Sequence, residues 1–305
     1  MIKLEKTDKN RSSKCIFPRI GSVFNDEVLY YNPFDIDLKY NYYVKKSDDN
    51  DGYLFCHEKS KNEKCLFKVY FKEHIPSGAL LLSENITNLS GQTILDLGSG
   101  TGIISIFAGM RNAQKAVAIE INSKCIEIAK YNFNLNNLDN CAEVLEGNMF
   151  DPIKGHKFDK IITNPPQMPT PKNNCDDQDY GGPYGFDFLD RMINTANNYL
   201  TPHGEIWIFL MEFLGITTRY GGYPTLFEKL EDSGFKPEIV ASASRIVRRG
   251  GATEKMIPYI LSIYPSYEFY DDSGNYYTGQ KIIKDELKNG TNMYYGVKVV
   301  KCVLK

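Results

Sequence analysis

The first 75 residues alternate short apolar stretches with polar clusters and contain few strong helix formers. Tyr, Phe and Val recur in the apolar stretches, and residues of this kind favour β-strands. The pattern predicts strands at 23–31, 38–44, 53–57 and 66–71. The Ser, Asp, Asn and Gly cluster at 47–52 indicates a turn between two of them. A small β-rich region is therefore expected over residues 1–75, with a role in recognising the substrate.

From about residue 76, short apolar runs alternate with longer amphipathic segments. Strands are predicted at 93–97, 115–119, 142–145, 158–163, 204–211 and 237–243. Helices are predicted at 79–88, 103–110, 123–135, 186–200 and 223–233. This alternation indicates a parallel sheet with right-handed crossovers. Residues 76–305 should form one catalytic domain, with a C-terminal extension from about residue 266.

The C-terminal part is harder to interpret, because two apolar runs are both candidates for the last strand of the sheet. Residues 257–264 and 293–304 both have the composition of strands, and either could supply the last strand of the sheet. A loop is expected around 271–275, and a short helix at 282–288.

Composition and charge argue against a membrane protein, a disulfide-rich protein and a protein with a global attraction for nucleic acid. The net charge of −2 provides no global attraction for nucleic acid. The apolar run at 206–211 is too short to cross a bilayer, and the N-terminus lacks the apolar segment of a signal peptide. Seven cysteines follow no disulfide or zinc spacing, so no metal is expected. We therefore expect a cytoplasmic protein without membrane contact; its oligomeric state stays open.

A glycine-rich turn joins the strand at 93–97 to the helix that follows. Such a turn lets the backbone approach a ligand and places helix N–H groups beside it. The turn comprises Asp96, Gly98, Ser99, Gly100, Thr101 and Gly102. The dinucleotide fingerprint would require glycine at position 103, where Ile103 stands. The carboxylate of Asp96 suits the sulfonium and ammonium groups of S-adenosylmethionine better than a pyrophosphate.

Two further polar residues follow neighbouring strands. Glu120 ends the second strand of the domain, where an acid can accept both hydroxyls of a ribose. Asn148 follows the third strand, and its amide could bond the adenine edge. Alone, each feature is explained by a turn or a helix cap. Together, and in register with a downstream motif, they predict a site for S-adenosylmethionine.

That downstream motif is Asn164-Pro165-Pro166-Gln167, directly after the strand at 158–163. Two consecutive prolines stiffen the backbone and remove two N–H donors. The side-chain oxygen of Asn164 and the backbone oxygen of Pro165 can accept hydrogen bonds from an NH₂ group. Such acceptance stabilises the charge that develops when a planar nitrogen is methylated. We interpret these four residues as catalytic, and we count Asn164 among the cofactor-binding residues as well.

The Asp96 to Gly102 loop and Glu120 resemble the first motif and the ribose-binding acid of class I S-adenosylmethionine-dependent methyltransferases. The Asn-Pro-Pro turn resembles the signature of methyltransferases that act on base amino groups and glutamine amides. The stretch from 146 to 167 is most similar to the release-factor glutamine methyltransferases. Members of that family carry an aromatic residue where this chain has Gln167, and many class I members carry Asp where it has Asn148.

This resemblance implies a Rossmann-like, seven-stranded α/β sheet. It also implies N-methylation of an amide or amine nitrogen on an acceptor protein or small molecule. Tyr180 and Tyr184, in the loop that follows the turn, are expected to bind the substrate in place of the missing aromatic residue. Gln167 could itself bond a polar acceptor.

Two other functions stay open from the sequence. One is methylation of a base amino group in RNA or DNA, for which Arg245, Arg248 and Arg249 form the densest basic patch. The other is a non-catalytic module that only binds S-adenosylmethionine. The near-neutral net charge argues against the first, and the intact Asn-Pro-Pro turn argues against the second.

Overall fold

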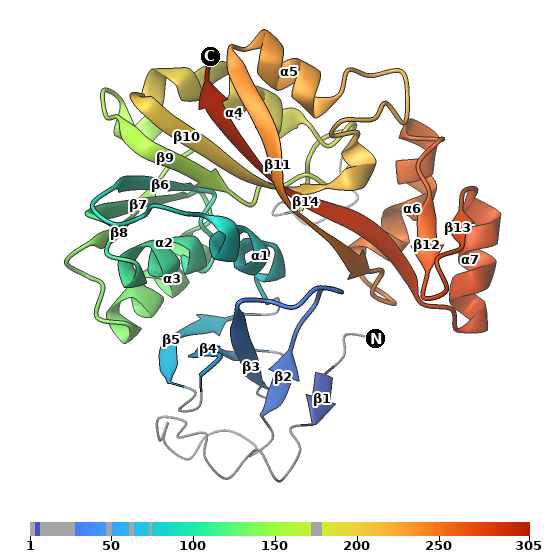
Figure 1. The fold of residues 1–305 in the computed structure, drawn as a ribbon, viewed down its shortest axis with the longest axis horizontal. Coiled ribbons are helices and arrows are strands. Elements are labelled where there is room, and N and C mark those ends of the chain that lie inside the picture. The colour runs from blue at the N-terminus through green and yellow to red at the C-terminus, as the bar shows by residue number, and fades with distance from the viewer. Residues whose placement is uncertain (1–3, 7–27, 47–50, 61–63, 73–74, 172–178) are drawn as a thin grey trace. The chain divides into compact units, whose positions relative to one another are not determined.

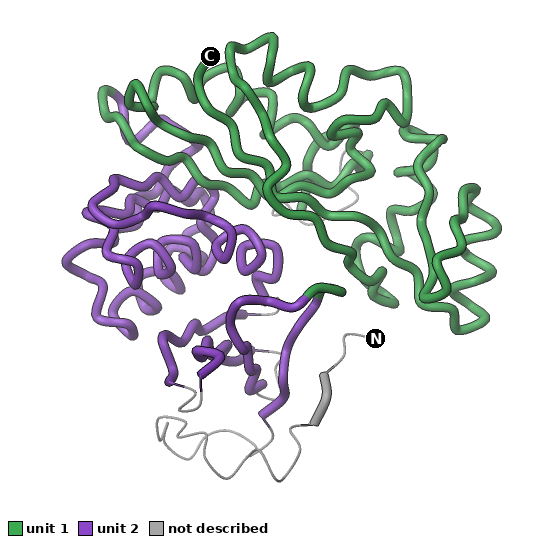
Figure 2. The backbone as a smooth tube through the Cα atoms, viewed as in Figure 1, with its two compact units in different colours: residues 1, 34–36, 155–305 green, residues 2–33, 37–154 purple. Residues whose placement is uncertain are grey.

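The computed structural model describes residues 4–6, 28–46, 51–60, 64–72, 75–171 and 179–305 (Figure 1). The chain forms two compact units, which are described separately (Figure 2). Unit 2 contains Ile2–Pro33 and Asp37–Lys154, and unit 1 contains Phe34–Ile36 and Gly155–Lys305. No helix in the described ranges has both the length and the apolar character needed to cross a membrane.

Unit 2 begins with an antiparallel five-stranded sheet whose strands follow one another in sequence order. Its strands are β1 (Leu4–Lys6), β2 (Leu29–Tyr31), β3 (Tyr40–Lys46), β4 (Gly52–Glu58) and β5 (Cys65–Phe71). The predicted β-rich N-terminal region is thus confirmed. Residues 23–27 of the first predicted strand and 47–50 of the predicted turn lie outside the described residues.

The second part of unit 2 alternates strands and helices. Its elements are α1 (Ser77–Asn85), β6 (Thr93–Leu97), α2 (Ile103–Met110), β7 (Lys115–Glu120), α3 (Ser123–Leu135), β8 (Ala142–Glu146) and a 3₁₀ turn (Asp151–Ile153). β6, β7 and β8 pair in parallel, with β7 in the middle. Leu95, Ala118 and Ile119 are buried, as expected for strands covered on both faces.

Two asparagines on α3 bind the outer edge of β5. Asn132 accepts from Tyr70 N (2.7 Å) and donates to Tyr70 O (2.9 Å). Asn136, one helical turn later, accepts from Lys68 N (3.1 Å) and donates to Lys68 O (2.7 Å). The spacing of i and i+4 on a helix is close to that of i and i+2 on a strand, so two side-chain amides can pair with successive outward-facing residues.

Glu84 at the end of α1 attaches that helix to the start of β3. Its buried carboxylate accepts from Lys39 N (2.8 Å), Tyr40 N (3.2 Å) and the Tyr42 hydroxyl (2.8 Å). Burial raises the pKa of this carboxyl group above its ordinary value, although the same hydrogen bonds oppose the rise. A polar group this deeply buried is tolerated because its oxygens are bonded.

Unit 1 contains the remaining strands and helices. Its strands are β9 (Phe158–Thr163), β10 (Leu200–Met211), β11 (Phe235–Ile246), β12 (Phe269–Asp271), β13 (Tyr276–Tyr277) and β14 (Met293–Leu304). Its α-helices are α4 (Asp187–Ala196), α5 (Leu226–Asp232), α6 (Ala252–Ile263) and α7 (Gln280–Asn289). β9 and β10 are parallel, whereas β14 runs antiparallel to both β10 and β11.

The structure corrects the C-terminal predictions. Residues 257–264 belong almost entirely to α6 and are not a strand, so β14 is the last long strand. The buried positions Ile257, Ile260 and Leu261 have helical spacing. The segment was nevertheless predicted as a strand, because isoleucine and tyrosine favour strands and Pro258 disfavours the interior of a helix. The predicted helix at 186–200 ends at Ala196, and after a 3₁₀ turn (Asn197–Tyr199) β10 already begins at Leu200.

Glu84→Ala should lower the free energy of unfolding by about 2–4 kcal/mol, because three hydrogen-bond donors, one of them the buried Tyr42 hydroxyl, would lose their acceptor. Urea denaturation followed by far-UV circular dichroism measures the change. Asn85→Ala is the matched control on the same helix, since Asn85 bonds only Leu81 O of its own turn. If the two variants were equally stable, Glu84 would not hold α1 to β3.

Candidate active site

The predicted glycine loop lies in unit 2 between β6 and α2. Gly98 N and Ser99 N both donate to Ile119 O of β7, at 2.9 and 3.1 Å. Gly102 has φ of 77°, and a Cβ there would lie 2.6 Å from the Phe133 ring. Only glycine combines this left-handed backbone with such close packing. The loop is thus held against β7 and α3 by its backbone.

Asp96 is fully buried at the end of β6. Its Oδ2 accepts from Ser105 N (3.1 Å) and Ser105 Oγ (2.9 Å) in the first turn of α2. Its Oδ1 has no hydrogen-bond partner among the residues that the structure describes. Burial is the main cause that raises the pKa of this carboxyl group to about 7, with a smaller contribution from the charge of Glu120. The group therefore titrates close to neutral pH.

Two hydroxyl oxygens in the loop are buried as well and have no partner in the described part of the chain. They are Ser99 Oγ and Thr101 Oγ1, so that this short segment contains three orphaned polar atoms together with Asp96 Oδ1. Each costs about 1–3 kcal/mol when left unbonded. Such a concentration is expected where a polar ligand supplies the missing partners, and it fits the cationic and hydroxyl groups of S-adenosylmethionine.

Glu120 makes more contacts with the backbone than the sequence indicates. Its Oε2 accepts from Gly100 N (2.9 Å), and its Oε1 accepts from Ile121 N and Asn122 N, both at 2.9 Å. A carboxylate offers about four lone-pair positions. One position is left for a ribose hydroxyl, so bonds to both hydroxyls would require one backbone amide to give up its bond.

Two exposed residues extend this edge of unit 2. Asn148 follows β8 and is exposed, in keeping with a residue that could contact a ligand. Ile121 follows Glu120 and is 66% exposed, which is unusual for a large apolar side chain. It is a candidate to cover the adenine face, and it was missed because an isoleucine next to a strand is normally assigned to the core.

Asn132 also reaches the glycine loop. Its Nδ2 donates to Thr101 O (2.9 Å) in addition to Tyr70 O. One buried side chain therefore connects β5 of the N-terminal sheet to the loop proposed for the cofactor. Sequence reasoning missed this residue, because an asparagine in a helix gives no signal of its partners.

The Asn164–Gln167 turn lies in unit 1 after β9. Gln167 is buried, and its Nε2 donates to Phe209 O (2.9 Å) and Pro165 O (3.3 Å) while its Oε1 accepts from Met211 N (2.7 Å). The expectation that Gln167 bonds the acceptor does not fit this geometry, because its amide is occupied by the backbone of β10 and of the turn. Asn164 is half-buried, and its side chain makes no hydrogen bond with a described residue.

The segment at 179–185, which contains three glycines, packs against this turn. Met168 N donates to Asp179 O (3.0 Å), and Gly181 N donates to Met168 O (3.1 Å). A Cβ on Gly181 would lie 2.6 Å from the backbone of Gln167. The segment at 179–181 therefore approaches the turn more closely than a side chain at position 181 would allow, and its hydrogen bonds to Met168 hold the end of the turn in place.

Tyr180 and Tyr184, the predicted aromatic replacements, lie on this segment. Tyr180 is half-buried and forms a bridge with Met168. Tyr184 is 42% exposed, and its ring centroid lies 4.4 Å from that of Tyr223. Residues 172–178 of the predicted loop lie outside the described residues. Where the structure describes side chains, no cluster of three or more metal-ligating groups is found.

Comparison with known proteins agrees with the geometry. The family model described as "Methyltransferase small domain" matches residues 64–233, more than half of the chain. A protein of Methanocaldococcus jannaschii that carries the name of a protein N5-glutamine methyltransferase is 33% identical over 168 residues, 53% of this chain and 80% of that relative.

Two other relatives match over shorter stretches. The release factor glutamine methyltransferase of Aquifex aeolicus is 32% identical over 36% of this chain and 43% of its own length. The ribosomal RNA small subunit methyltransferase C of Buchnera aphidicola is 30% identical over 47% of this chain and 41% of its own length. This chain thus spans less than half of either protein. The predicted class I α/β fold is confirmed, and the chain belongs to the methyltransferase small domain family, whose methyl donor is S-adenosylmethionine.

Proposed function

We propose that this methyltransferase methylates the side-chain amide nitrogen of a glutamine in an acceptor protein. The observation that carries the proposal is the turn at Asn164, where a polar side chain without a partner among the described residues stands on a backbone fixed by two prolines. The turn already holds one carboxamide, since Gln167 Nε2 bonds Pro165 O. The names of the relatives from Methanocaldococcus jannaschii and Aquifex aeolicus support the same acceptor class.

We assign cofactor binding to unit 2. Asp96 would face the cationic groups of S-adenosylmethionine, while Ser99 and Thr101 would donate or accept through their orphaned hydroxyls. Glu120 would accept a ribose hydroxyl. Asn148 and Ile121 would contact the adenine. The remaining predicted members of the site are Gly98, Gly100 and Gly102, which let the backbone approach the ligand.

The bound cofactor supplies a methyl group on a positively charged sulfur. Asn164 Oδ1 would accept one N–H of the acceptor amide, and the unused lone pair of Pro165 O would accept the other. These two acceptors would hold the amide nitrogen in position to receive the methyl group that the cofactor would supply, and the N–H proton that the nitrogen loses would pass to water. Acceptance by the two oxygens stabilises the charge on nitrogen during transfer, so no strong base is required.

A second candidate is transfer to a base amino group of RNA, supported by the name of the Buchnera aphidicola relative. Arg245, Arg248 and Arg249 could contact phosphates. The net charge of −2 weighs against it. Free cysteines, such as the buried Cys56 and Cys302, are typical of a reducing compartment, and we propose a cytoplasmic location.

The acceptor class is tested with radiolabelled S-adenosylmethionine and fractionated cell extract. Protein-bound label that survives ribonuclease, is released by protease and co-elutes with N5-methylglutamine after digestion is the expected result. Label that ribonuclease releases would overturn the proposed acceptor in favour of RNA. Label confined to small molecules would likewise exclude a protein acceptor.

Binding of S-adenosylmethionine should release a proton below neutral pH. The folded pKa of Asp96 is raised from 3.8 to about 7, so the free protein is protonated at this group in mildly acidic solution. A cationic ligand favours the carboxylate, and affinity should therefore rise with pH up to about 7 and then level off. Calorimetry at pH 6.5 in two buffers of different ionisation enthalpy measures the released proton. Asp96→Asn should abolish the release, and an unchanged release in that variant would exclude Asp96 as its source.

The contact of Asn132 with the glycine loop should affect cofactor affinity as well as stability. Asn132→Ala removes two hydrogen bonds to Tyr70 of β5, and Asn136→Ala removes the equivalent two to Lys68. Each variant should destabilise the protein by about 1–3 kcal/mol. Only Asn132→Ala also frees Thr101 O, so it alone should weaken binding of S-adenosylhomocysteine by about tenfold. Urea denaturation and calorimetry separate the two effects. Equal affinities in the two variants would show that the loop does not depend on Asn132.

Asn164→Ala should reduce turnover by about 10²–10³, the loss seen when one preorganised group is removed from a transition state. Cofactor affinity, measured on the same samples, should change far less. Asn164→Asp keeps an oxygen of similar size and should retain part of the turnover. Full turnover in both variants on the identified substrate would mean that the turn is only structural.

A further inference from the structure

Four tyrosines from three chain segments of unit 1 form a cluster beside the turn at 164–167. The members of this tyrosine cluster are Tyr180 and Tyr184 of the segment at 179–185, Tyr223 of the loop before α5, and Tyr259 of α6. Tyr184 is exposed, and the other three are half-buried. The sequence pointed to the first two as substrate-binding residues, whereas nothing so far gives a role to the other two.

The segment that carries Tyr180 and Tyr184 adjoins the turn directly. Tyr180 forms a bridge with Met168, the residue that follows the turn. Tyr184 precedes Gly185, where a Cβ would lie 2.7 Å from Gln167 O. Both tyrosines are therefore next to the residues that we propose for the acceptor amide.

A buried tyrosine at the end of α6 connects Tyr184 to Tyr223. The hydroxyl of Tyr264, which is 2% exposed, donates to Tyr184 O (2.6 Å). The ring centroid of Tyr264 lies 6.4 Å from that of Tyr223, and the Tyr223 centroid lies 4.4 Å from that of Tyr184. Separations of roughly this size are typical of packed aromatic pairs. The two half-exposed rings are thus fixed to a buried residue.

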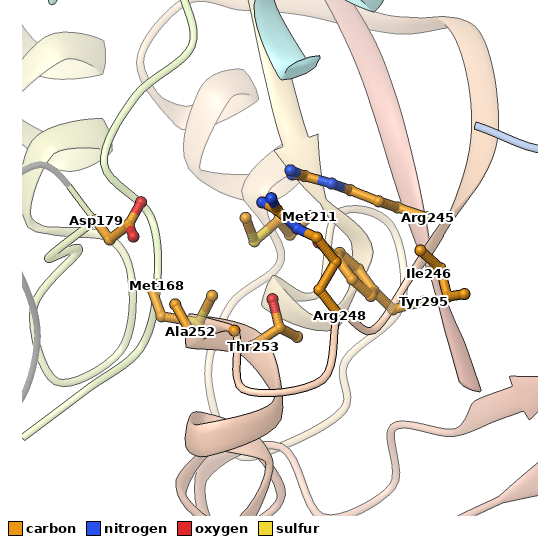
Figure 3. A pocket seen from close by; sticks show the side chains of 10 residues that line it. Met168, Asp179, Met211, Arg245, Ile246, Arg248, Ala252, Thr253 and Tyr295 are labelled. Atoms are coloured by element: carbon orange, nitrogen blue, oxygen red, sulfur yellow. The ribbon is translucent and has the colours of Figure 1, made fainter. Parts of the chain in front are cut away.

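Tyr259 extends the cluster from α6. Ala252, in the first turn of this helix, lines a small cavity of about 70 Å³ together with Met168 and Asp179 (Figure 3). Tyr259 follows Ala252 by about two helical turns, so it lies on the same side of α6. Burial, followed by the nearby Tyr184 and Tyr180 hydroxyls, raises the pKa of the Tyr259 hydroxyl above its ordinary value.

The centre of the tyrosine cluster is uncharged. The pKa of the Tyr223 hydroxyl is raised first by the nearby Tyr184 hydroxyl and then by burial, with a smaller contribution from Tyr259. Among the described residues, no carboxylate or cation contributes to the shift at Tyr223 or at Tyr259. The hydroxyl groups therefore face one another and not a charged side chain.

Charged side chains flank the tyrosine cluster on the same segments. They are Asp179, Asp187, Glu254 and Lys255. Glu254 accepts from Gly250 N before the start of α6. A Cβ on Gly182 would lie 2.1 Å from Cγ of Asp187, so this carboxyl group is packed against the chain. Asp179 lines the cavity with Met168 (Figure 3). The cluster itself offers aromatic rings and hydroxyl groups.

Rings and hydroxyl groups in this arrangement suit an extended peptide without charged side chains. Tyrosine rings cover apolar surface, and each hydroxyl can donate to a C=O group or accept from an N–H group. An extended segment leaves its backbone groups without internal partners, so that they are available to such hydroxyls. Aromatic surfaces also recognise proline, whose ring is flat and apolar and whose backbone is already extended.

On the basis of the proposed function, we infer that the tyrosine cluster binds the extended, uncharged segment of the acceptor protein that flanks the methylated glutamine. Tyr180 and Tyr184 adjoin the turn, and Tyr223 and Tyr259 enlarge the surface that these two offer. The enzyme thus recognises the main chain around its glutamine in addition to the amide itself.

Saturation-transfer NMR on the full chain tests binding without requiring methyl transfer. The probe is a blocked, uncharged peptide of proline and alanine that contains no glutamine. It should bind, and Tyr223→Leu or Tyr259→Leu should weaken it by about fivefold or more, as expected of tyrosines in an interface. Tyr276→Leu is the matched control, because this tyrosine of β13 is 66% exposed and lies outside the cluster.

Equal binding in the parent and in both leucine variants of the cluster would overturn the inference, as would an equal loss in Tyr276→Leu. Tighter binding of a lysine or glutamate peptide would show that charge is recognised in place of the main chain. Binding of an oligoadenylate that depends on Tyr223, without binding of the peptide, would overturn the inference in favour of nucleic acid. The probe lacks glutamine, so these results do not depend on the proposed methylation.

A second measurement connects the tyrosine cluster to the reaction. For a glutamine peptide with proline and alanine flanks, Tyr259→Leu should raise KM by about fivefold and change kcat by less than about twofold. N-acetylglutaminamide has no flanking residues, so its kcat/KM should be the same in the variant and the parent. An equal loss for both acceptors would overturn the role of Tyr259 in recognising the flank. Tyrosine-dependent binding of the peptide without methylation of either acceptor would instead contradict the proposed function.

Discussion

The glycine loop that we propose for the cofactor depends on a carboxylate that is removed from water. Asp96 lies near the end of β6 in the core of unit 2, where the charged form is costly, and Ser105 is the one described residue that bonds its carboxylate. This residue fixes the start of α2 relative to β6, and therefore the path of the glycine turn between them. One carboxylate oxygen stays unbonded. A site in this condition gains free energy when a cation arrives, because the ligand supplies the partner that folding did not.

The Asn164–Gln167 turn in unit 1, which we propose for the acceptor, is fixed by hydrogen bonds of a neutral side chain. The Gln167 amide bonds three backbone groups, and the glycines at 181 and 185 allow a second chain segment to approach the turn closely. Each of the two segments is thus fixed by a side chain that bonds a neighbouring element, Asp96 in unit 2 and Gln167 in unit 1.

The hydrophobic pattern of the sequence was sufficient to predict helices and strands whose bounds depend on neighbouring residues alone. The helix at 123–135 and the strands at 93–97 and 158–163 have the predicted bounds, because period and flanking polar residues agree there. The sequence could not show that Gln167 bonds Phe209, or that Asn132 bonds Tyr70, because these partners are 42 and 62 positions away in the chain. The helix around Ile257 was assigned to a strand because its β-branched and tyrosine residues favour strands, whereas tertiary packing of Ile257, Ile260 and Leu261 decides for a helix.

The pairing of α3 with β5 has a consequence for the behaviour of the protein in the cell. β5 is the last strand of its sheet, and the outward N–H and C=O groups of such a strand can template pairing with a second molecule. The amides of Asn132 and Asn136 occupy those groups at Tyr70 and Lys68. The helix thereby opposes strand addition at this edge without contributing a strand of its own, and two side chains cover the β5 edge of a sheet rich in Tyr, Phe and Val.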